Sequence, residues 1–458
     1  MEWKNFYTGG RIDLDYTSDM EIRVTTVEET DGADYRACHA ALLAAGYEKY
    51  TENEIVGNLF ATFTKGDEVL HTAFYPTLSL ARLITEPRGY LPPLTAPIYE
   101  KKKSPSITQF GAEDCYGDIG ELHIEEREDG KKIRYYDGDM RFCTGSGAAF
   151  GMSYVLQLED GSFVIVDGGC HVPANECYEG NDKDLDALLE FLKTNNEGTG
   201  YEKPRVTWLV THSHPDHMSL PNRFLVVYHD EIQVELVGFS FPNFDDPQLM
   251  LGKESVQIAG DRVKRFRNHI RENYPHAKFF SFHAGQRLFL PGCELEFLQT
   301  HEDYRHRDKT EDGNPYVFHW LNFTSPMWKM KFGDRTVLFM GDGEFAVADQ
   351  LMDVYGNYLK SDVLQVIHHG YSGGLERFSR IFTENEGITY CMWPTDGTRF
   401  FDERRCGEHP DTYFNYILRT APNCRHFHAG HRVTVKLDDM TVSAKGDPLI
   451  CDDLGQDL

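Results

Sequence analysis

The feature that most constrains this chain is a run of histidine and aspartate residues directly after an apolar segment. Residues 206–211 read Val-Thr-Trp-Leu-Val-Thr, which predicts a buried strand. His212, His214, Asp216 and His217 follow at once. Residues two apart on an extended chain project to the same side, so the first two imidazoles can reach one metal ion. The proline after His214 turns the chain, which directs the aspartate and the last histidine towards a second ion.

Chance is a poor explanation of this run. The chain has 20 His in 458 residues, so three histidines at specified positions are expected roughly 0.04 times per chain. The alternative interpretation is a histidine-rich capped turn that binds no metal. That alternative is weakened by further metal-ligating residues downstream.

Two later strands are followed by the same kinds of side chain. An apolar strand over 336–340 precedes Asp342, and another over 362–367 precedes His368 and His369. Because sites in α/β proteins usually lie at the carboxyl ends of the strands, these side chains can converge on one edge of a sheet. The sequence therefore predicts a site for two divalent metal ions. We expect zinc, and manganese and iron stay open because His and Asp ligands suit all three.

The rest of the chain predicts an α/β protein in two parts. Strands alternate with helical patterns beyond about residue 106, which favours a layered α/β architecture. The first 90 residues combine a helical pattern over 33–46 with alternating apolar segments and short turns, which is typical of a small α+β unit. A Pro- and Lys-bearing stretch over 87–105 is the best linker. We expect an accessory domain over 1–105 and the main domain over 106–458.

Composition and charge exclude several classes of protein. The 46 Lys+Arg and 73 Asp+Glu residues give a formal net charge of −27. That charge disfavours a nucleic-acid partner, since such proteins usually carry a basic surface. No apolar run approaches the roughly 20 residues that span a bilayer. The start of the chain lacks the features of a secretory signal, and the ten cysteines form no Cys-x-x-Cys pair. We therefore expect reduced thiols and a cytoplasmic location.

These motifs resemble those of the metallo-β-lactamase superfamily of metal-dependent hydrolases. Residues 212–217 match its His-x-His-x-Asp-His signature, Asp167-Gly-Gly resembles the end of its first strand pair, and Met340-Gly-Asp resembles the strand end with the bridging aspartate. The resemblance covers about residues 107–435. It implies a four-layer αββα sandwich. Within the superfamily, the chain looks closest to the hydrolase domains of DNA-uptake competence proteins and to phosphorylcholine esterases, on the segments 322–334, 368–370 and 408–410.

The resemblance implies a role for each side chain of the predicted site. His212 and His214 would bind the first metal, Asp216 and His217 the second, and Asp342 would lie between the two ions. One histidine of the downstream pair would complete the second metal's ligands.

Some assignments within this ligand set stay open. We favour His369 as the second metal's ligand and His368 as a contact of a substrate phosphoryl oxygen, although the order could be reversed. For the first metal's third histidine the candidate is His301, which follows the predicted strand over 295–298. His306 and His319 compete with it for that role.

Two ions about 3.5 to 4 Å apart would lower the pKa of a bridging water, and the hydroxide would attack phosphorus or a carbonyl carbon. Asp216 or Asp342 could accept its proton, and Tyr371, Ser372 and His409 are weaker candidates for orienting the substrate. A phosphoester or phosphodiester of small-molecule or envelope type is the favoured substrate. The alternatives are a hydrolase of a carbon ester, lactone, thioester or amide, and a metal-retaining binding module without activity. The N-terminal part could cap the active site or form the interface of a homo-oligomer.

Overall fold

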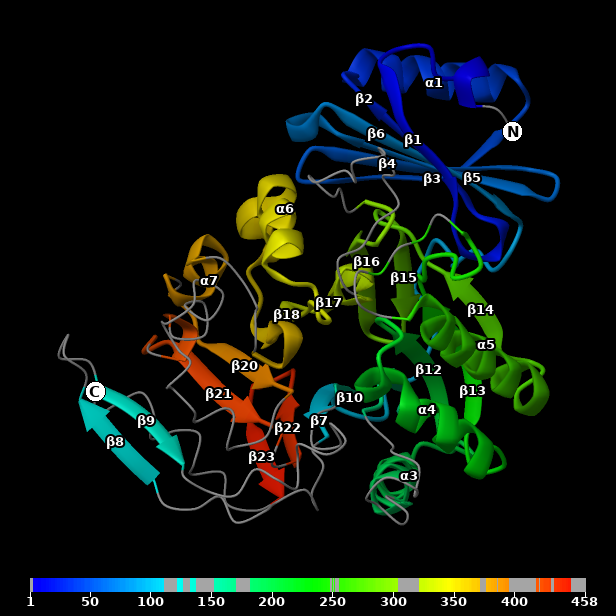
Figure 1. Ribbon diagram of the computed structural model, residues 1–458. Helices are drawn as coiled ribbons and strands as arrows, with labels where there is room; N and C mark the ends of the chain where they lie inside the picture. The colour runs from blue at the N-terminus through cyan, green and yellow to red at the C-terminus, as the bar shows by residue number, and fades with distance from the viewer. Residues whose placement is uncertain are drawn as a thin grey trace.

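The computed structural model places its strands in three large sheets and one hairpin (Figure 1). The structure describes residues 3–110, 122–126, 132–136, 152–169, 182–247, 249, 251, 255–303, 321–370, 376–384, 386–394, 417–419, 421–429 and 432–445. The hairpin pairs β8 (Leu122–Glu126) with β9 (Lys132–Tyr136). Short 3₁₀ segments are η1 (Trp3–Asn5), η2 (Asp19–Glu21), η3 (Pro76–Leu78), η5 (Leu321–Thr324), η6 (Gly356–Leu359) and η7 (Ile367–Gly370).

The first sheet and one helix make up an N-terminal unit, drawn in blue at the top of Figure 1. Its antiparallel strands lie in the order β1-β2-β6-β5-β4-β3. They are β1 (Arg11–Thr17), β2 (Arg23–Glu28), β3 (Glu48–Ile55), β4 (Asn58–Lys65), β5 (Glu68–Tyr75) and β6 (Leu80–Pro87). Helix α1 (Gly32–Ala44) begins where the Asp31 carboxylate accepts hydrogen bonds from the next backbone amides. The helix covers the sheet face that is turned away from the rest of the chain.

The second sheet has eight strands in the order β14-β13-β12-β11-β10-β7-β22-β23. They are β7 (Ser106–Gln109), β10 (Ser153–Gln157), β11 (Phe163–Asp167), β12 (Arg205–Val210), β13 (Gln233–Phe239), β14 (Lys278–Ser281), β22 (Arg432–Lys436) and β23 (Val442–Lys445). Its helices are α3 (Asp182–Asn196), α4 (Pro215–Val227) and α5 (Val256–Asn273). These helices and the outer face of the sheet share one core, to which Leu188, Phe224 and Phe266 contribute from the helices.

The third sheet has seven strands in the order β15-β16-β17-β18-β19-β20-β21. They are β15 (Arg287–Leu290), β16 (Cys293–Gln299), β17 (Met327–Phe332), β18 (Arg335–Phe339), β19 (Val363–Gln365), β20 (Thr389–Trp393) and β21 (Cys424–His428). Helices α6 (Phe345–Tyr355) and α7 (Glu376–Thr383) pack on its outer face. A separate core, which includes Tyr154 and Trp328, fills the space between the second and third sheets.

The layers therefore run helix, sheet, sheet, helix, which is the αββα sandwich that the resemblance implies. The reason is the apolar character of both faces of each central strand: all five residues of β10 and of β11 are buried. The N-terminal unit packs on the same outer face as α6, since Phe60 and Tyr75 share a core with Leu351. All its strands precede residue 88 and all sandwich strands follow 105. The predicted division of the chain into two domains at that point stays a prediction.

Several predicted elements are confirmed, and the departures have physical causes. The hairpin of β10 and β11 turns at Asp160-Gly161 as expected. Strand β3 was not predicted, because its residues are mostly polar and exposed and carry no apolar alternation. Strand β6 begins at Leu80, because Pro76 opens a 3₁₀ turn that ends at Ser79 in the left-handed region. Within the described ranges no helix is long and apolar enough to cross a membrane.

Candidate metal centre

Two histidines and the α4 carboxylate are held by the junction between β12 and α4. Strand β12 ends at Val210, and His212 and His214 follow on extended chain before α4 starts at Pro215. His214 is the residue before the first helical turn, and a proline suits the first helical position because it needs no amide partner. Asp216 then lies within the first turn of the helix, where a carboxylate is stabilised by the helix dipole.

The downstream ligands follow two parallel strands that are neighbours in the third sheet. Strand β18 pairs with β19, so Asp342 after the first and His369 after the second reach the same edge. Gly341 has φ +53°, and a Cβ there would lie 2.8 Å from the Cβ of Ser325. Both histidines of η7 also have positive φ, of 46° and 53°. Left-handed backbone at consecutive non-glycine residues is costly and typically persists where the surroundings and a function require it.

The first group of donor atoms comprises His212, His214 and Asp342, whose potential ligand atoms all lie within 4.8 Å of one another. The Nε2 of His212 lies 2.9 Å from the Nδ1 of His214 and 3.9 Å from Oδ2 of Asp342. His212 is fully buried. These atoms can hold one metal ion in the arrangement that the sequence predicts.

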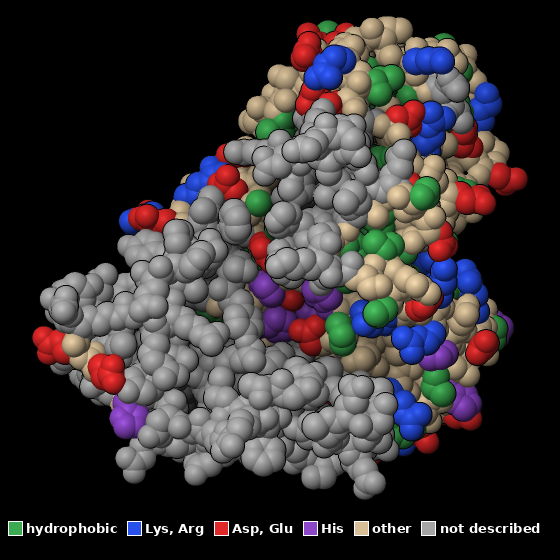
Figure 2. Space-filling model, viewed as in Figure 1, with side chains coloured by type: hydrophobic (Ala, Val, Ile, Leu, Met, Phe, Trp, Pro, Cys, Tyr) green, Lys and Arg blue, Asp and Glu red, His purple; other side chains and the backbone are tan. Residues whose placement is uncertain are grey.

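The second group comprises Asp216, His217, His369 and the same Asp342. Oδ2 of Asp342 lies 3.1 Å from the Nε2 of His217 and 3.2 Å from the Nε2 of His369. The Nε2 of His369 also lies 3.1 Å from Oδ2 of Asp216. One carboxylate thus belongs to both groups and lies between them. Figure 2 shows histidine and acidic side chains together near the centre of one face of the molecule.

A buried carboxylate oxygen without a partner supports a metal ion at these groups. Oδ1 of Asp342 is buried and has no hydrogen-bond partner among the described residues. Such an atom is costly to bury unless something ligates it. A cation between the two groups would satisfy it.

Neighbouring groups hold the imidazoles in the orientation that a metal requires. The Asp167 carboxylate, at the end of β11, lies 2.7 Å from Nδ1 of His217 and accepts hydrogen bonds from the backbone amide and the hydroxyl of Thr211. Nδ1 of His369 donates to the carbonyl of Pro394 at 2.5 Å. Each contact occupies Nδ1 and leaves Nε2 directed at the shared space, as is usual for metal-ligating histidines.

Burial and mutual attraction set the charges of these groups. Burial alone would raise the pKa of Asp342, but the imidazoles of His217 and His369 hold it well below its usual range. Burial would lower the pKa of each imidazole, yet Asp342 and the other carboxylates raise the pKa of His369 to about 10. They raise the pKa of His217 well above its usual value. Metal ions would take the place of the protons, because ligation needs neutral imidazoles and ionised carboxylates.

Asp167 gives a direct test of this orientation. We expect Asp167→Asn to weaken metal binding by about 10- to 100-fold, because the His217 ring loses the carboxylate that fixes its tautomer. Titration against a metallochromic chelator measures the change. Asp160→Asn is the matched control: that carboxylate is also buried and hydrogen-bonded, but it lies in the turn at the other end of β11. Equal metal affinities of the two variants would contradict the role of Asp167. The sequence analysis did not assign Asp167 this role, although it noted the Asp-Gly-Gly motif in which Asp167 stands.

Other predicted residues lie elsewhere. The ring nitrogens of His301 face hydroxyl groups of Ser18 at 3.0 Å and Ser240 at 3.2 Å, and His301 belongs to neither donor group among the described residues. The structure therefore does not bring it to the first metal's place. His368 lies beside the site with Nε2 3.0 Å from the Asn322 side-chain amide and its side chain 21% exposed. The predicted Tyr371, Ser372 and His409, and the competing His306 and His319, lie outside the described residues.

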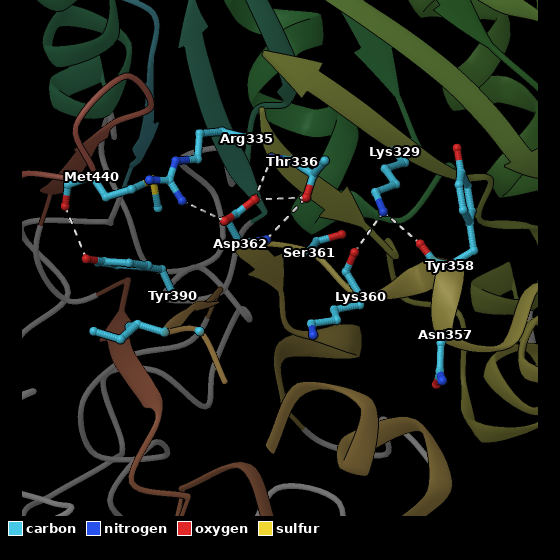
Figure 3. Close-up of a pocket in the computed structure, with 12 residues that line it drawn as sticks. Lys329, Arg335, Thr336, Asn357, Tyr358, Lys360, Ser361, Asp362, Tyr390 and Met440 are labelled. Carbon is cyan, nitrogen blue, oxygen red and sulfur yellow. Dashed lines mark hydrogen bonds and ion pairs between the residues drawn. The ribbon is translucent and has the colours of Figure 1, made fainter. Parts of the chain in front are cut away.

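A separate pocket lies at the opposite edge of the third sheet (Figure 3). Arg335 begins β18 and Asp362 directly precedes β19, whereas the metal-edge residues follow these strands; the two side chains pair at 3.0 Å. The ammonium group of Lys329 donates to the backbone carbonyls of Tyr358 and Lys360, at 2.7 Å each. This pocket is therefore not part of the metal edge.

No protein-family model matches the sequence. No curated protein matches it either. Among solved structures, the chain is similar to the metallo-beta-lactamase fold protein YhfI from Bacillus subtilis at 12% identity and a TM-score of 0.37, over 75% of this chain and 100% of that one. It is similar to CmlA, a diiron β-hydroxylase from Streptomyces venezuelae, at 14% identity and a TM-score of 0.34, over 62% of this chain and 52% of that one.

A flavo di-iron protein mutant from Thermotoga maritima is also similar, at 13% identity and a TM-score of 0.22, over 52% of this chain and 50% of that one. These TM-scores carry no argument about chemistry, so the chemistry of the site is argued from the distances between its own side chains. The predicted closeness to competence-protein hydrolases and phosphorylcholine esterases stays a prediction. The chain has the αββα layering that its motifs led us to expect. The residues of the metal edge are identified by the distances given above.

Proposed function

We propose that this chain is a metal-dependent hydrolase of the metallo-β-lactamase superfamily that cleaves a phosphoester or phosphodiester. The observation that supports it best is the position of Asp342, whose Oδ2 atom is shared by two donor groups. A carboxylate in that position can bridge two ions. Zinc is our first choice, because imidazole and carboxylate together suit it, and the same donors accept manganese or iron.

Two divalent ions, when bound, make a water acidic near neutral pH and stabilise negative charge on oxygen. The protein's own groups then divide the remaining work. The Asp216 side chain is 26% exposed, so its carboxylate can reach both the donor group and an incoming substrate. The Nε2 of His368 lies 3.0 Å from the Asn322 amide beside the donor groups, and His368 would contact a phosphoryl oxygen of the substrate. Asp167 and Pro394 keep the ligating rings in place and take no proton from the substrate.

The test combines metal analysis with a substrate panel. We expect turnover of bis(p-nitrophenyl) phosphate or p-nitrophenyl phosphorylcholine, and we expect His214→Ala to lose about one metal ion per chain and nearly all activity. His229→Ala is the matched control, because that histidine lies on the surface after α4, 43% exposed. A lactone and a thioester complete the panel. Turnover of the lactone or the thioester alone would mean that the enzyme attacks carbon and not phosphorus. A protein that binds no metal would overturn the proposal.

A further inference from the structure

A second cluster of metal-ligating side chains lies where the N-terminal unit meets the sandwich. It consists of His71 on β5, Glu86 on β6 and His283 in the segment after β14. Neighbouring strands β5 and β6 bring the first two together, with His71 paired to Ile84, two residues before Glu86. Because side chains alternate along a strand, both point to the sheet face opposite α1. That face packs on the sandwich, which supplies the third residue.

The three side chains converge within bonding reach of one ion. The Nε2 of His71 lies 2.9 Å from Oε1 of Glu86, and the Nε2 of His283 lies 3.5 Å from Oε2 of the same carboxylate. The donor atoms all lie within 4.8 Å of one another. Nitrogen and oxygen ligands at about 2.0–2.2 Å around a tetrahedral zinc lie about 3.3 Å apart. The two nitrogen–oxygen spacings of 2.9 and 3.5 Å lie on either side of that value.

Both imidazoles are already oriented for ligation. Nδ1 of His71 lies 2.9 Å from the Thr62 hydroxyl, and Nδ1 of His283 lies 2.6 Å from Oε2 of Glu302. Each ring therefore has one nitrogen held by a neighbour and the other directed at Glu86, which is the arrangement of histidines at metal sites. The His283 side chain is fully buried, and its Nε2 lies 3.5 Å from Oε2 of Glu86, which is longer than a well-formed hydrogen bond. A cation between these two atoms would bind both.

The balance of charge also favours a divalent cation. Two carboxylates, Glu86 and Glu302, contact the histidines of the cluster. With both imidazoles neutral, one divalent ion matches the two carboxylates in number of charges. It would take the place of any proton that the imidazoles share with these carboxylates, because ligation needs neutral imidazoles.

We propose that His71, Glu86 and His283 form a third metal site, separate from the dinuclear centre, that binds one zinc ion and joins the N-terminal unit to the sandwich. None of its three ligands belongs to the dinuclear groups. Because the ligands come from both parts of the chain, the ion is bound only when the two are docked. Its role is therefore structural, and its binding energy adds to the stability of the docked state.

The experiment uses the full chain with the dinuclear centre removed by His212→Ala, His214→Ala and Asp342→Asn. We expect that variant to retain about one zinc per chain by mass spectrometry of metals. Cobalt in its place should give visible absorption bands that the metal-free protein lacks. Adding Glu86→Gln or His71→Asn should abolish both signals and lower Tm by roughly 5 °C or more. His39→Asn, which removes another buried histidine of the N-terminal unit, should leave both signals unchanged.

Two results would overturn the third site. One is a folded variant without the dinuclear ligands that retains no zinc, with circular dichroism and gel filtration matching those of the unchanged protein. The other is zinc retention that Glu86→Gln and His71→Asn leave unaltered. A zinc-edge anomalous map of the unchanged protein gives an independent answer if the variants do not fold. It should show a peak between the three side chains, and peaks only at the dinuclear centre would contradict the proposal while leaving the hydrolase intact.

Discussion

Asp342→Asn should release metal from both donor groups and lower turnover by at least about 10³-fold. Oδ2 of Asp342 lies 3.1 to 3.2 Å from two imidazole nitrogens of one group and 3.9 Å from the His212 nitrogen of the other. The amide keeps the shape of the side chain but loses the negative charge that two cations would share. Metal content and turnover, measured on the same preparation, check the result.

The matched control for this substitution is Asp362→Asn. Asp362 lies before β19, at the other edge of the same sheet, and pairs with Arg335 and Thr336. Its replacement should cost some stability and leave the metal content unchanged. If Asp342→Asn retained its metals and its activity, the shared carboxylate would not be a ligand, and the dinuclear interpretation would fail with it.

Arg82→Met should destabilise the protein by about 3–5 kcal/mol, because it leaves a buried carboxylate without its cation. The guanidinium group is 1% exposed and donates to Asp303 and to the carbonyl of Ala284 at 3.0 Å. Asp303 is also buried and accepts a hydrogen bond from Tyr75 at 2.6 Å. This pair joins β6 to the segment after β16. Urea unfolding, followed by tryptophan fluorescence and circular dichroism, measures the loss.

Two further variants separate charge burial from general damage. Arg23→Met removes a guanidinium that pairs with Asp15 on the surface, where both side chains are over a third exposed, and it should cost less than about 1 kcal/mol. Arg82→Met combined with Asp303→Asn should recover a large part of the loss, because no unpaired charge then remains buried. A loss for Arg82→Met as small as that for Arg23→Met would mean that the junction does not depend on this pair.

The donor atoms of the dinuclear edge could be predicted because each follows a strand. His212, His214 and Asp216 stand in one short run, and Asp342 and His369 follow apolar segments that are clear in the sequence. Local pattern places such residues at strand ends, and strand ends of one α/β sheet meet at one edge. The convergence seen in the structure follows from that geometry.

His301 shows where the same reasoning fails. It follows strand β16 as the prediction requires, yet its ring faces Ser18 of the N-terminal unit and Ser240. The prediction used only the position of a histidine directly after a strand. That position does not reveal which part of the chain will pack against the end of the strand. Here the N-terminal unit packs on the third sheet beside β16 and provides a partner for the ring.

By itself, the sequence determined the layered α/β class, because strand patterns are local. The two-part organisation and the metal ligands that it predicts stay predictions. Only the tertiary structure decided that β7 pairs with β22 from the far end of the chain. It also decided that His71, Glu86 and His283 meet. Each of these stands in its own segment, with no spacing pattern that links it to the other two, and their contact arises only when the N-terminal unit docks on the sandwich. Docking depends on the shape and apolar area of whole faces, which no short pattern encodes.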